Sequence, residues 1–193
     1  MKKLFFLTTL ITGMIFTVAF TTIKDDVYTV DTQKSSIEWS AKKVGGGHTG
    51  TVKIVEGSLI YNGKSLQKGS FIMDMSSITS DNERVTNHLK SPDFFSSEKN
   101  PTSKFEITKV SAAGKDLVNI TGNLTIKGIT HALSFPASVK QQGSLVVAAA
   151  SKVRIDRTKY DIRFRSKTFF GDIGDKAIDD EFELTINLTA KKN

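Results

Sequence analysis

The sequence predicts an all-β protein of about eight antiparallel strands. Along most of the chain after residue 25, apolar residues recur at every second position, which is the pattern of a strand with one buried face. Short turn signals, among them Asn62-Gly63, Lys127-Gly128 and Gln142-Gly143, separate these runs. Connections this brief join only antiparallel neighbours. Strands with one apolar side can close into a barrel or form two facing sheets, and the pattern favours the barrel slightly.

The alternating runs define the expected inward-facing residues. In chain order these are Ile37, Trp39 and Ala41; Phe71, Met73 and Met75; Phe105, Ile107, Val118, Ile120, Leu124 and Ile126; Leu133, Phe135, Ala137 and Val139; Leu145, Val147, Ala149, Val153 and Ile155; and Phe182, Leu184, Ile186 and Leu188. Polar residues occupy the intervening positions. Asn119, Asn123 and Asn187 each begin an Asn-x-Thr sequon, but we interpret them as ordinary outer-face residues of strands.

One connection is predicted to be a short helix. Ser80 and Glu83 have the spacing of a capping box, and Val85 and Leu89 lie one turn apart on one helical face. Pro92 disfavours helical geometry at the residue before it, so the helix should end there.

Two large rings, Phe94 and Phe95, follow the predicted helix in a stretch that is otherwise polar. Together with the apolar face of the helix, they would suit a lid across one mouth of a barrel. The alternative is that they fill a corner of an ordinary core.

The N-terminal residues 1–22 have the layout of a secretory signal. Lys2 and Lys3 precede an uncharged, mostly apolar run from Leu4 to Phe20, and small residues follow it. A retained membrane anchor is the alternative. We expect cleavage, a single mature domain over residues 23–193, and a periplasmic or secreted location. The formal net charge of +7 would then fall to +5 through loss of the two lysines.

The composition excludes several kinds of chemistry. The chain has no cysteine, so disulfides, thiolate metal sites and a cysteine nucleophile are excluded. His48, His88 and His131 lie far apart and match no metal-binding pattern, and the acidic stretch Gly171–Glu181 lacks the spacing of a calcium loop. No serine elbow, P-loop or dinucleotide fingerprint occurs. We expect no metal and no cofactor.

The strongest charged feature is the segment from Lys152 to Lys167. Guanidinium groups pair well with phosphate oxygens, so arginines rimming an open mouth could hold the anionic head of a lipid. The candidate head-group residues are Arg154, Arg157, Arg163 and Arg165. The alternative is that they are outward-facing strand residues near a turn. Nucleic acid is not an expected partner, because no run interleaves surface aromatics with basic residues.

The chain resembles the YceI-like family of lipocalin-like, polyisoprenoid-binding proteins. The resemblance runs from YTVDTQKSSIEWSAKKVGGGHTG to FELTINLTA, and it is most specific in SSITSDNERVTNHLKSPDFFSSEKNPTSKFE, VNITGNLTIKGITHALSFPASV and RIDRTKYDIRF. It implies an exported, extended eight-stranded antiparallel β-barrel, with a short helix and loop covering one end. The barrel would enclose a polyisoprenoid or other long-chain lipid. One departure is that Val85 and Thr86 stand where many members carry an Arg-Asp pair.

With this resemblance, the inward apolar face becomes a predicted lipid cavity. Its expected lining residues are Trp39, Phe71, Met73, Phe94, Phe95, Phe105, Leu124, Phe135, Val147 and Phe182. We expect a binding protein that performs no chemical turnover and touches membrane surfaces transiently. Its oligomeric state stays open, with a homodimer as one option.

Two rival interpretations belong to other classes. One is an enzyme acting on an isoprenoid lipid, with His48, His88 or His131 as acid or base. The other is a β-sandwich with a filled core that serves as an interaction or stress protein. An internal cavity too small for an acyl chain would favour the sandwich.

Overall fold

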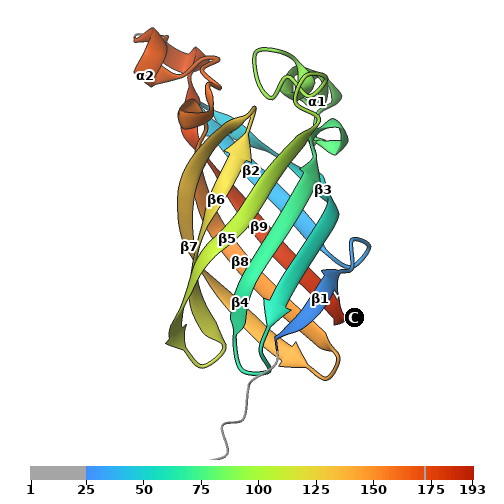
Figure 1. Ribbon diagram of the computed structural model, residues 1–193. Helices are drawn as coiled ribbons and strands as arrows, with labels where there is room; N and C mark the ends of the chain where they lie inside the picture. The colour runs from blue at the N-terminus through green and yellow to red at the C-terminus, as the bar shows by residue number, and fades with distance from the viewer. Residues whose placement is uncertain (1–24, 172) are drawn as a thin grey trace, which may run out of the picture.

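The computed structural model describes residues 25–171 and 173–193. Within this part, the chain forms a single antiparallel sheet rolled into a tall barrel, with helical connections gathered at one end (Figure 1). The strands are β1 (Asp26–Val30), β2 (Ser36–Lys43), β3 (Gly46–Tyr61), β4 (Leu66–Asp74), β5 (Thr102–Gly114), β6 (Leu117–Ile126), β7 (Ile129–Gln142), β8 (Leu145–Asp156) and β9 (Ile178–Lys192). The helical segments are η1 (Met75–Ser77), α1 (Glu83–Lys90), η2 (Arg157–Tyr160), α2 (Lys167–Phe170) and η3 (Gly174–Lys176). The expected signal segment, residues 1–22, lies outside the described residues.

The barrel has eight strand positions because β1 and β2 share one of them. The strand order is β1-β3-β2-β9-β8-β7-β6-β5-β4, and pairing of β3 with β4 closes the ring. At one end, β2 lies between β3 and β9, with Ile37 opposite Val52 and Ile186. At the other end β1 takes that place, with Tyr28 opposite Leu59 and Lys192. The expected eight-stranded antiparallel barrel is confirmed, and a sandwich is excluded.

A bulge in β8 corrects one predicted strand face. Ala150 pairs with Ile186, but Val153 pairs with Leu184, so β8 has one residue more than β9 between these pairs. Lys152 sits in this bulge with a left-handed φ of 54°. An extra residue reverses the alternation on one side of a bulge. Leu145, Val147 and Ala149 were therefore expected on the wrong face. The inward residues are Val146, which is completely buried, Ala148 and Ala150.

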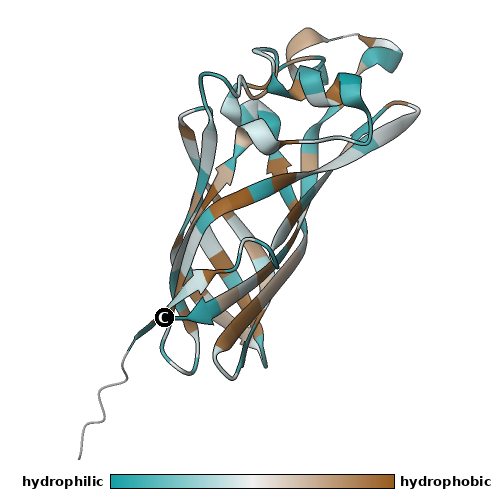
Figure 2. Cartoon of the chain, turned by 90° about the vertical axis from the view of Figure 1, so that its right-hand side faces the viewer, coloured by the Kyte–Doolittle hydropathy of each residue, from teal (hydrophilic) through white to brown (hydrophobic). Residues whose placement is uncertain are grey.

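The strands face the interior with apolar side chains. In Figure 2, hydrophobic and hydrophilic residues follow one another along the strands. At the end away from the helices, which we call the closed end, Tyr28, Leu59 and Val146 are at most 1% exposed. The ring of Tyr61 packs edge-on against Tyr28 at 6.1 Å. The interior is therefore packed shut at this end.

We call the opposite end of the barrel the mouth end. There α1 begins at Glu83, directly after its N-cap residue, which is not the one that the sequence predicts. The side chain of Asn82 accepts a hydrogen bond from the Val85 amide at 3.2 Å, so Asn82 is the N-cap and the predicted capping box at Ser80 is wrong. The amide of Ser80 instead donates to the Thr86 hydroxyl at 2.8 Å. The helix ends at Lys90, before Pro92, as predicted. Within the described ranges, no helix is long and apolar enough to cross a membrane.

Candidate ligand-binding cavity

The barrel interior contains two neighbouring apolar chambers. Measured as the space open to the centre of a water-sized sphere, the lower chamber, toward the closed end, has a volume of about 80 Å³, and the upper chamber has about 110 Å³. The chambers share the lining residues Ile37, Met73, Leu124, Ile155 and Leu184. Because these residues border both spaces, the two chambers adjoin each other inside the barrel.

The lining of this cavity is almost entirely hydrocarbon. Among the described residues that border the upper chamber, Ser103 and Arg157 carry polar side chains. The Ser103 hydroxyl lies 3.0 Å from the sulfur of Met75. The Arg157 guanidinium donates to the carbonyl oxygens of Ile162, Asp179 and Ile178 at 2.9–3.0 Å. Neither group offers a free polar partner inside, so the cavity suits an apolar chain.

Small residues create the room. Ala137, Ala148 and Ala150 line the lower chamber where larger side chains would fill it. Gly122 also faces inward, and a Cβ atom there would lie 2.4 Å from Cζ of Phe105. Its missing side chain lets the Phe105 ring lie against β6, where its centroid is 5.7 Å from that of Phe135. The sequence analysis did not predict that these alanines leave space for a ligand. The run Ala148–Ala150 was the available signal, because alanine is uncommon in strands.

Nine of the ten predicted lining residues border the cavity. Trp39, Phe94, Phe95 and Phe182 border the upper chamber, Phe71, Phe105 and Phe135 the lower chamber, and Met73 and Leu124 both. The tenth, Val147, lies in a shallow groove on the outer surface, beside Lys140 and Thr189, because of the bulge in β8. Trp39 is oriented by a hydrogen bond from its indole nitrogen to the Thr79 carbonyl at 3.0 Å.

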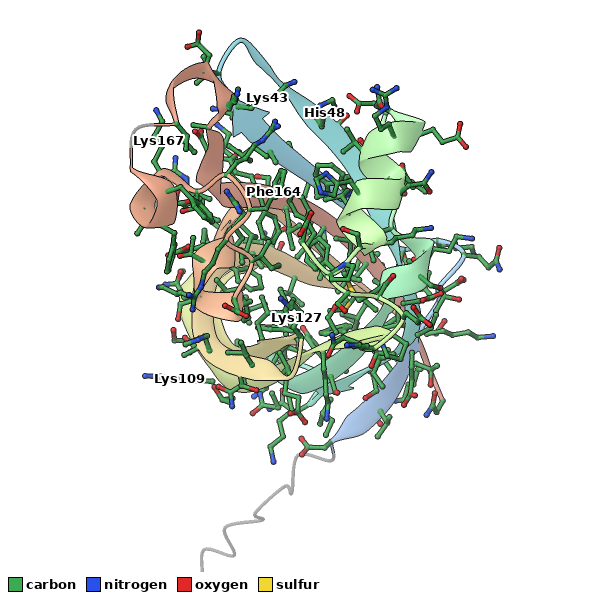
Figure 3. All side chains as sticks on the ribbon, turned by 90° about the horizontal axis from the view of Figure 1, so that it is seen from above. Lys43, His48, Lys109, Lys127, Phe164 and Lys167 are labelled. Atoms are coloured by element: carbon green, nitrogen blue, oxygen red, sulfur yellow. The ribbon has the colours of Figure 1, made fainter. Side chains whose placement is uncertain are left out.

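The upper chamber continues into a polar space at the mouth end, which we call the vestibule. Its volume by the same measure is about 320 Å³, and it is lined by Lys43, Val44, His48, Val85, His88, Leu89, Phe94, Phe164, Arg165, Asp175, Lys176 and Ile178. Leu89, Phe94 and Ile178 also line the upper chamber. Seen from above in Figure 3, Phe164 lies over the barrel end, with Lys43 and His48 toward one side. The vestibule therefore connects the apolar cavity with the surface.

Three rings narrow this connection. His88 and Phe94 come from the segment between β4 and β5, and Phe164 comes from the segment between β8 and β9. The Phe164 centroid lies 4.6 Å from that of His88 and 5.4 Å from that of Phe94. Two long connections thus meet across the mouth through an aromatic contact, which we call the ring gate.

The histidines do not form a common site. His48 contacts Asp81 at 2.9 Å, His88 contacts Asp93 at 3.0 Å, and the ring of His131 contacts the Lys159 carbonyl at 2.9 Å. The hydrogen bond with His48 lowers the pKa of Asp81 below its ordinary value. Within the part of the chain that the structure describes, no three His, Cys, Asp or Glu residues are grouped to hold a metal ion.

The four arginines predicted for a head group have different roles. Arg154 pairs with Glu183 across the outer face of β8 and β9 at 3.4 Å, and Arg157 is 4% exposed and bonded to backbone carbonyls. Arg163 pairs with Asp161 at 2.9 Å. Of the four, Arg165 lines the vestibule.

Sequence reasoning missed Lys43 and Lys176 as neighbours of Arg165 in the vestibule. These two lysines are far apart in the sequence, but the amide of Val44 donates to the Ala177 carbonyl at 3.4 Å and brings them to the same rim. Asp175 contributes one opposing charge. The vestibule therefore combines three permanent cations with one carboxylate, which favours an anionic or strongly polar group.

Known proteins are similar to this chain in sequence or in fold. A UPF0312 protein of Pseudomonas paraeruginosa is 34% identical over 115 residues, which cover 58% of this chain and 60% of that relative. A UPF0312 protein of Pseudomonas putida strain W619 is 26% identical over 114 residues, covering 58% of this chain and 59% of the relative. The matched segments thus span about three fifths of these relatives.

Solved structures match over more of the chain. BcnA of Burkholderia cenocepacia superimposes with a TM-score of 0.72 at 20% identity, covering 84% of this chain and 99% of that one. A polyisoprenoid binding domain from Saccharophagus degradans, implicated in plant cell wall breakdown, gives 0.66 at 12% identity, with 86% and 98% covered. The YceI-like domain matches residues 28–190. Because this match spans most of the sequence, the chain belongs to the YceI-like domain family.

Proposed function

We propose that this protein binds a polyisoprenoid or similar long-chain lipid, with the apolar chain inside the barrel and the polar head in the vestibule. The observation that carries the proposal is the pair of adjoining apolar chambers, which lie between a packed floor at Tyr28 and a cationic rim. The polyisoprenoid binding domain from Saccharophagus degradans has the same fold and supports this class of ligand.

The energetics indicate what such binding is for. Each isoprene unit has five carbons, and removing them from water is worth about 3 to 4 kcal/mol at ~0.8 kcal/mol per methylene. Summed over a long chain, this exceeds the limit of non-covalent affinity of about 18 to 21 kcal/mol, so ordering costs offset part of it. The interior of a bilayer removes the lipid chain from water just as the barrel does. The barrel therefore competes with membranes, and its role is to carry, store or shield the chain.

The proposed setting is outside the cytoplasm. Residues 1–22 have the layout of an export signal, and a lipid-shielding barrel is needed where an apolar chain must cross or wait in an aqueous space. We infer binding without turnover, because the three histidines form no common site and the described lining residues of the lower chamber carry no acid or base group.

Native mass spectrometry of the mature protein tests this proposal. The protein is purified without detergent from a bacterial host that makes polyprenyl lipids. We expect one bound lipid per chain, identified as an isoprenoid after organic extraction. Protein that carries no stoichiometric lipid, and takes up none from polyprenyl phosphate or a fatty acid, would contradict the proposal.

A further inference from the structure

The connection between β8 and β9 exposes two adjacent aromatic rings. Phe169 is 44% exposed and Phe170 is 57% exposed, both on the single turn α2. Val44, at the tip of the β2–β3 turn and also at the mouth end, is 44% exposed. Large apolar side chains exposed together are costly in water and commonly mark a contact surface.

These rings are held outward by a fixed backbone. The amides of Phe169 and Phe170 both donate to the Ser166 carbonyl, at 3.2 and 3.0 Å, and Ser166 itself is completely buried. The Thr168 hydroxyl, between them and Lys167, donates to Asp180 at 2.6 Å. The inner side of the turn is thus bonded to β9. The two rings are therefore already exposed to solvent before any partner binds.

The surroundings of the rings are basic. Residues 157–176 contain six lysines and arginines against three aspartates, and five of the six remain when the buried Arg157 is left out. The guanidinium of Arg163 lies over the Phe169 ring, 4.4 Å from its centroid, and Lys167 begins the same turn. Aromatic rings flanked by Lys and Arg suit the interface of a bilayer, where the rings reach the acyl boundary and the cations meet anionic head groups.

The position of α2 relates this surface to the cavity. α2 stands at the mouth end, beyond the ends of the strands (Figure 1), and the same connection supplies Phe164 and Arg165 to the vestibule. Leu117, by contrast, is 50% exposed at the start of β6, beside the β5–β6 turn at the closed end. A flat partner that touches α2 would therefore face the opening of the barrel.

We propose that Phe169, Phe170 and Val44, with Arg163, Lys167 and Lys43 around them, form a docking surface for an anionic phospholipid bilayer. Docking places the vestibule against the membrane, so that a lipid passes between bilayer and cavity without crossing water. The purpose of this surface rests on the proposed function, but its existence is measured independently of lipid loading.

Two reporter variants locate the contact. In a Trp39→Phe background, which removes the chain's one native tryptophan, Phe170→Trp and Leu117→Trp place a reporter at opposite ends of the barrel. With vesicles of brominated phosphatidylglycerol, we expect the emission of Phe170→Trp to shift to the blue and be quenched, and that of Leu117→Trp to stay unchanged. Absence of quenching at position 170, or equal quenching by brominated phosphatidylcholine, would overturn the proposal.

Sedimentation with the same vesicles measures the two contributions separately. We expect the double variants Phe169→Ala/Phe170→Ala and Arg163→Gln/Lys167→Gln each to bind roughly tenfold more weakly. The control Leu117→Ala should bind like the wild type. A blue-shifted Phe170→Trp emission that needs no vesicles and rises with protein concentration would instead identify a second copy of the chain as the partner, and would overturn the bilayer.

Bound lipid distinguishes this proposal from the proposed function. Docking variants that bind vesicles like the wild type refute the docking surface even if the protein still carries lipid. Wild-type protein that docks on vesicles but never contains a lipid refutes the proposed function and leaves the docking surface standing.

Discussion

The closed end and the mouth end of this barrel use the same alternating strands, but one is filled and the other is hollow. At the closed end, Tyr28, Leu59, Val146 and Ala190 are at most 1% exposed, and the Tyr28 hydroxyl accepts a hydrogen bond from Gln141 at 3.0 Å. Toward the mouth, the inward side chains border unfilled chambers instead. Alternation therefore decides which side chains point inward, whereas their size and the connections above them decide whether they meet.

The lengths of the connections between strands help to explain why one end is filled and the other is hollow. At the closed end, turns of a few residues join the strands and β1 fills the space that β2 leaves. At the mouth end, the segments 75–101 and 157–177 are long enough to lie across the opening, and they meet in the ring gate. A hollow barrel with one sealed end and one covered end admits a ligand from a single direction.

The largest expected effect is a difference in the free energy of unfolding between aspartate substitutions at two neighbouring valines of the closed end. Val146→Asp places a carboxylate where no water or partner is available, and it should lower the free energy of unfolding by about 3 to 5 kcal/mol. Val147→Asp lies on the outer face and should change it by less than about 0.5 kcal/mol. Urea denaturation of both variants measures this difference. Equal destabilisation would mean that the bulge in β8 is wrongly placed.

A substitution in the hollow half should remove the ligand while leaving the fold intact. Ala150→Phe puts a ring into the lower chamber, so the amount of long-chain lipid recovered with the protein should fall about tenfold or more. Ala132→Phe, the same change at an exposed position of β7, is the matched control. Circular dichroism checks the fold. Wild-type lipid content in Ala150→Phe would place the ligand elsewhere.

The ring gate should control exchange more than affinity. Phe164→Ala removes the ring that joins the two mouth segments, so release of a fluorescent lipid into detergent micelles should accelerate several-fold. Stopped-flow fluorescence follows the release. Leu117→Ala at the closed end should leave the rate unchanged, and an unchanged rate in Phe164→Ala would show that these rings do not gate the cavity.

The smallest expected effect is a loss of local stability at acidic pH through protonation of Asp180. Burial raises the pKa of Asp180, but the neighbouring Ser166 hydroxyl, the hydrogen bond from Thr168 and the charge of Arg157 together bring it below its ordinary value. A carboxyl group with a depressed folded-state pKa stabilises the fold above its unfolded pKa of about 4, and this contribution is lost as the pH falls through the folded value.

We therefore expect the segment 157–177 to loosen slightly as the pH falls below about 4, and the Asp180→Asn variant to lack this dependence. Amide hydrogen exchange of this segment at a series of pH values, corrected for the intrinsic rates, measures it. A pH dependence that persists in Asp180→Asn would assign it to another group.

Sequence reasoning placed the regular strands well and the irregular ones poorly. The runs in β2, β6, β7 and β9 alternate without interruption, so their inward faces followed directly from periodicity. β3 was not among the predicted runs, because Gly50 and Gly57 replace apolar residues in it and a register shift between Ile54 and Glu56 breaks its alternation. The bulge at Lys152 gave no signal, since lysine rarely adopts a positive φ.

The candidate site likewise has one part that the sequence predicted and one part that it did not. The large apolar lining residues could be predicted because each belongs to a regular run or to the lid. The vestibule could not, because Lys43 ends β2 whereas Arg165 and Lys176 lie in the β8–β9 connection, and their meeting depends on loop geometry. Basic residues in one continuous segment suggested a head-group site, but spacing alone does not show that Arg157 is buried or that Arg154 faces outward.

Trp39 provides the most direct test of the hollow interior. It is the one tryptophan of the chain and borders the upper chamber. Protein stripped of lipid on a hydrophobic resin is titrated with a brominated long-chain lipid while the Trp39 emission is recorded. We expect quenching that saturates at one lipid per chain and is reversed by an unlabelled polyprenyl lipid, whereas unchanged Trp39 emission at saturating lipid would contradict the account.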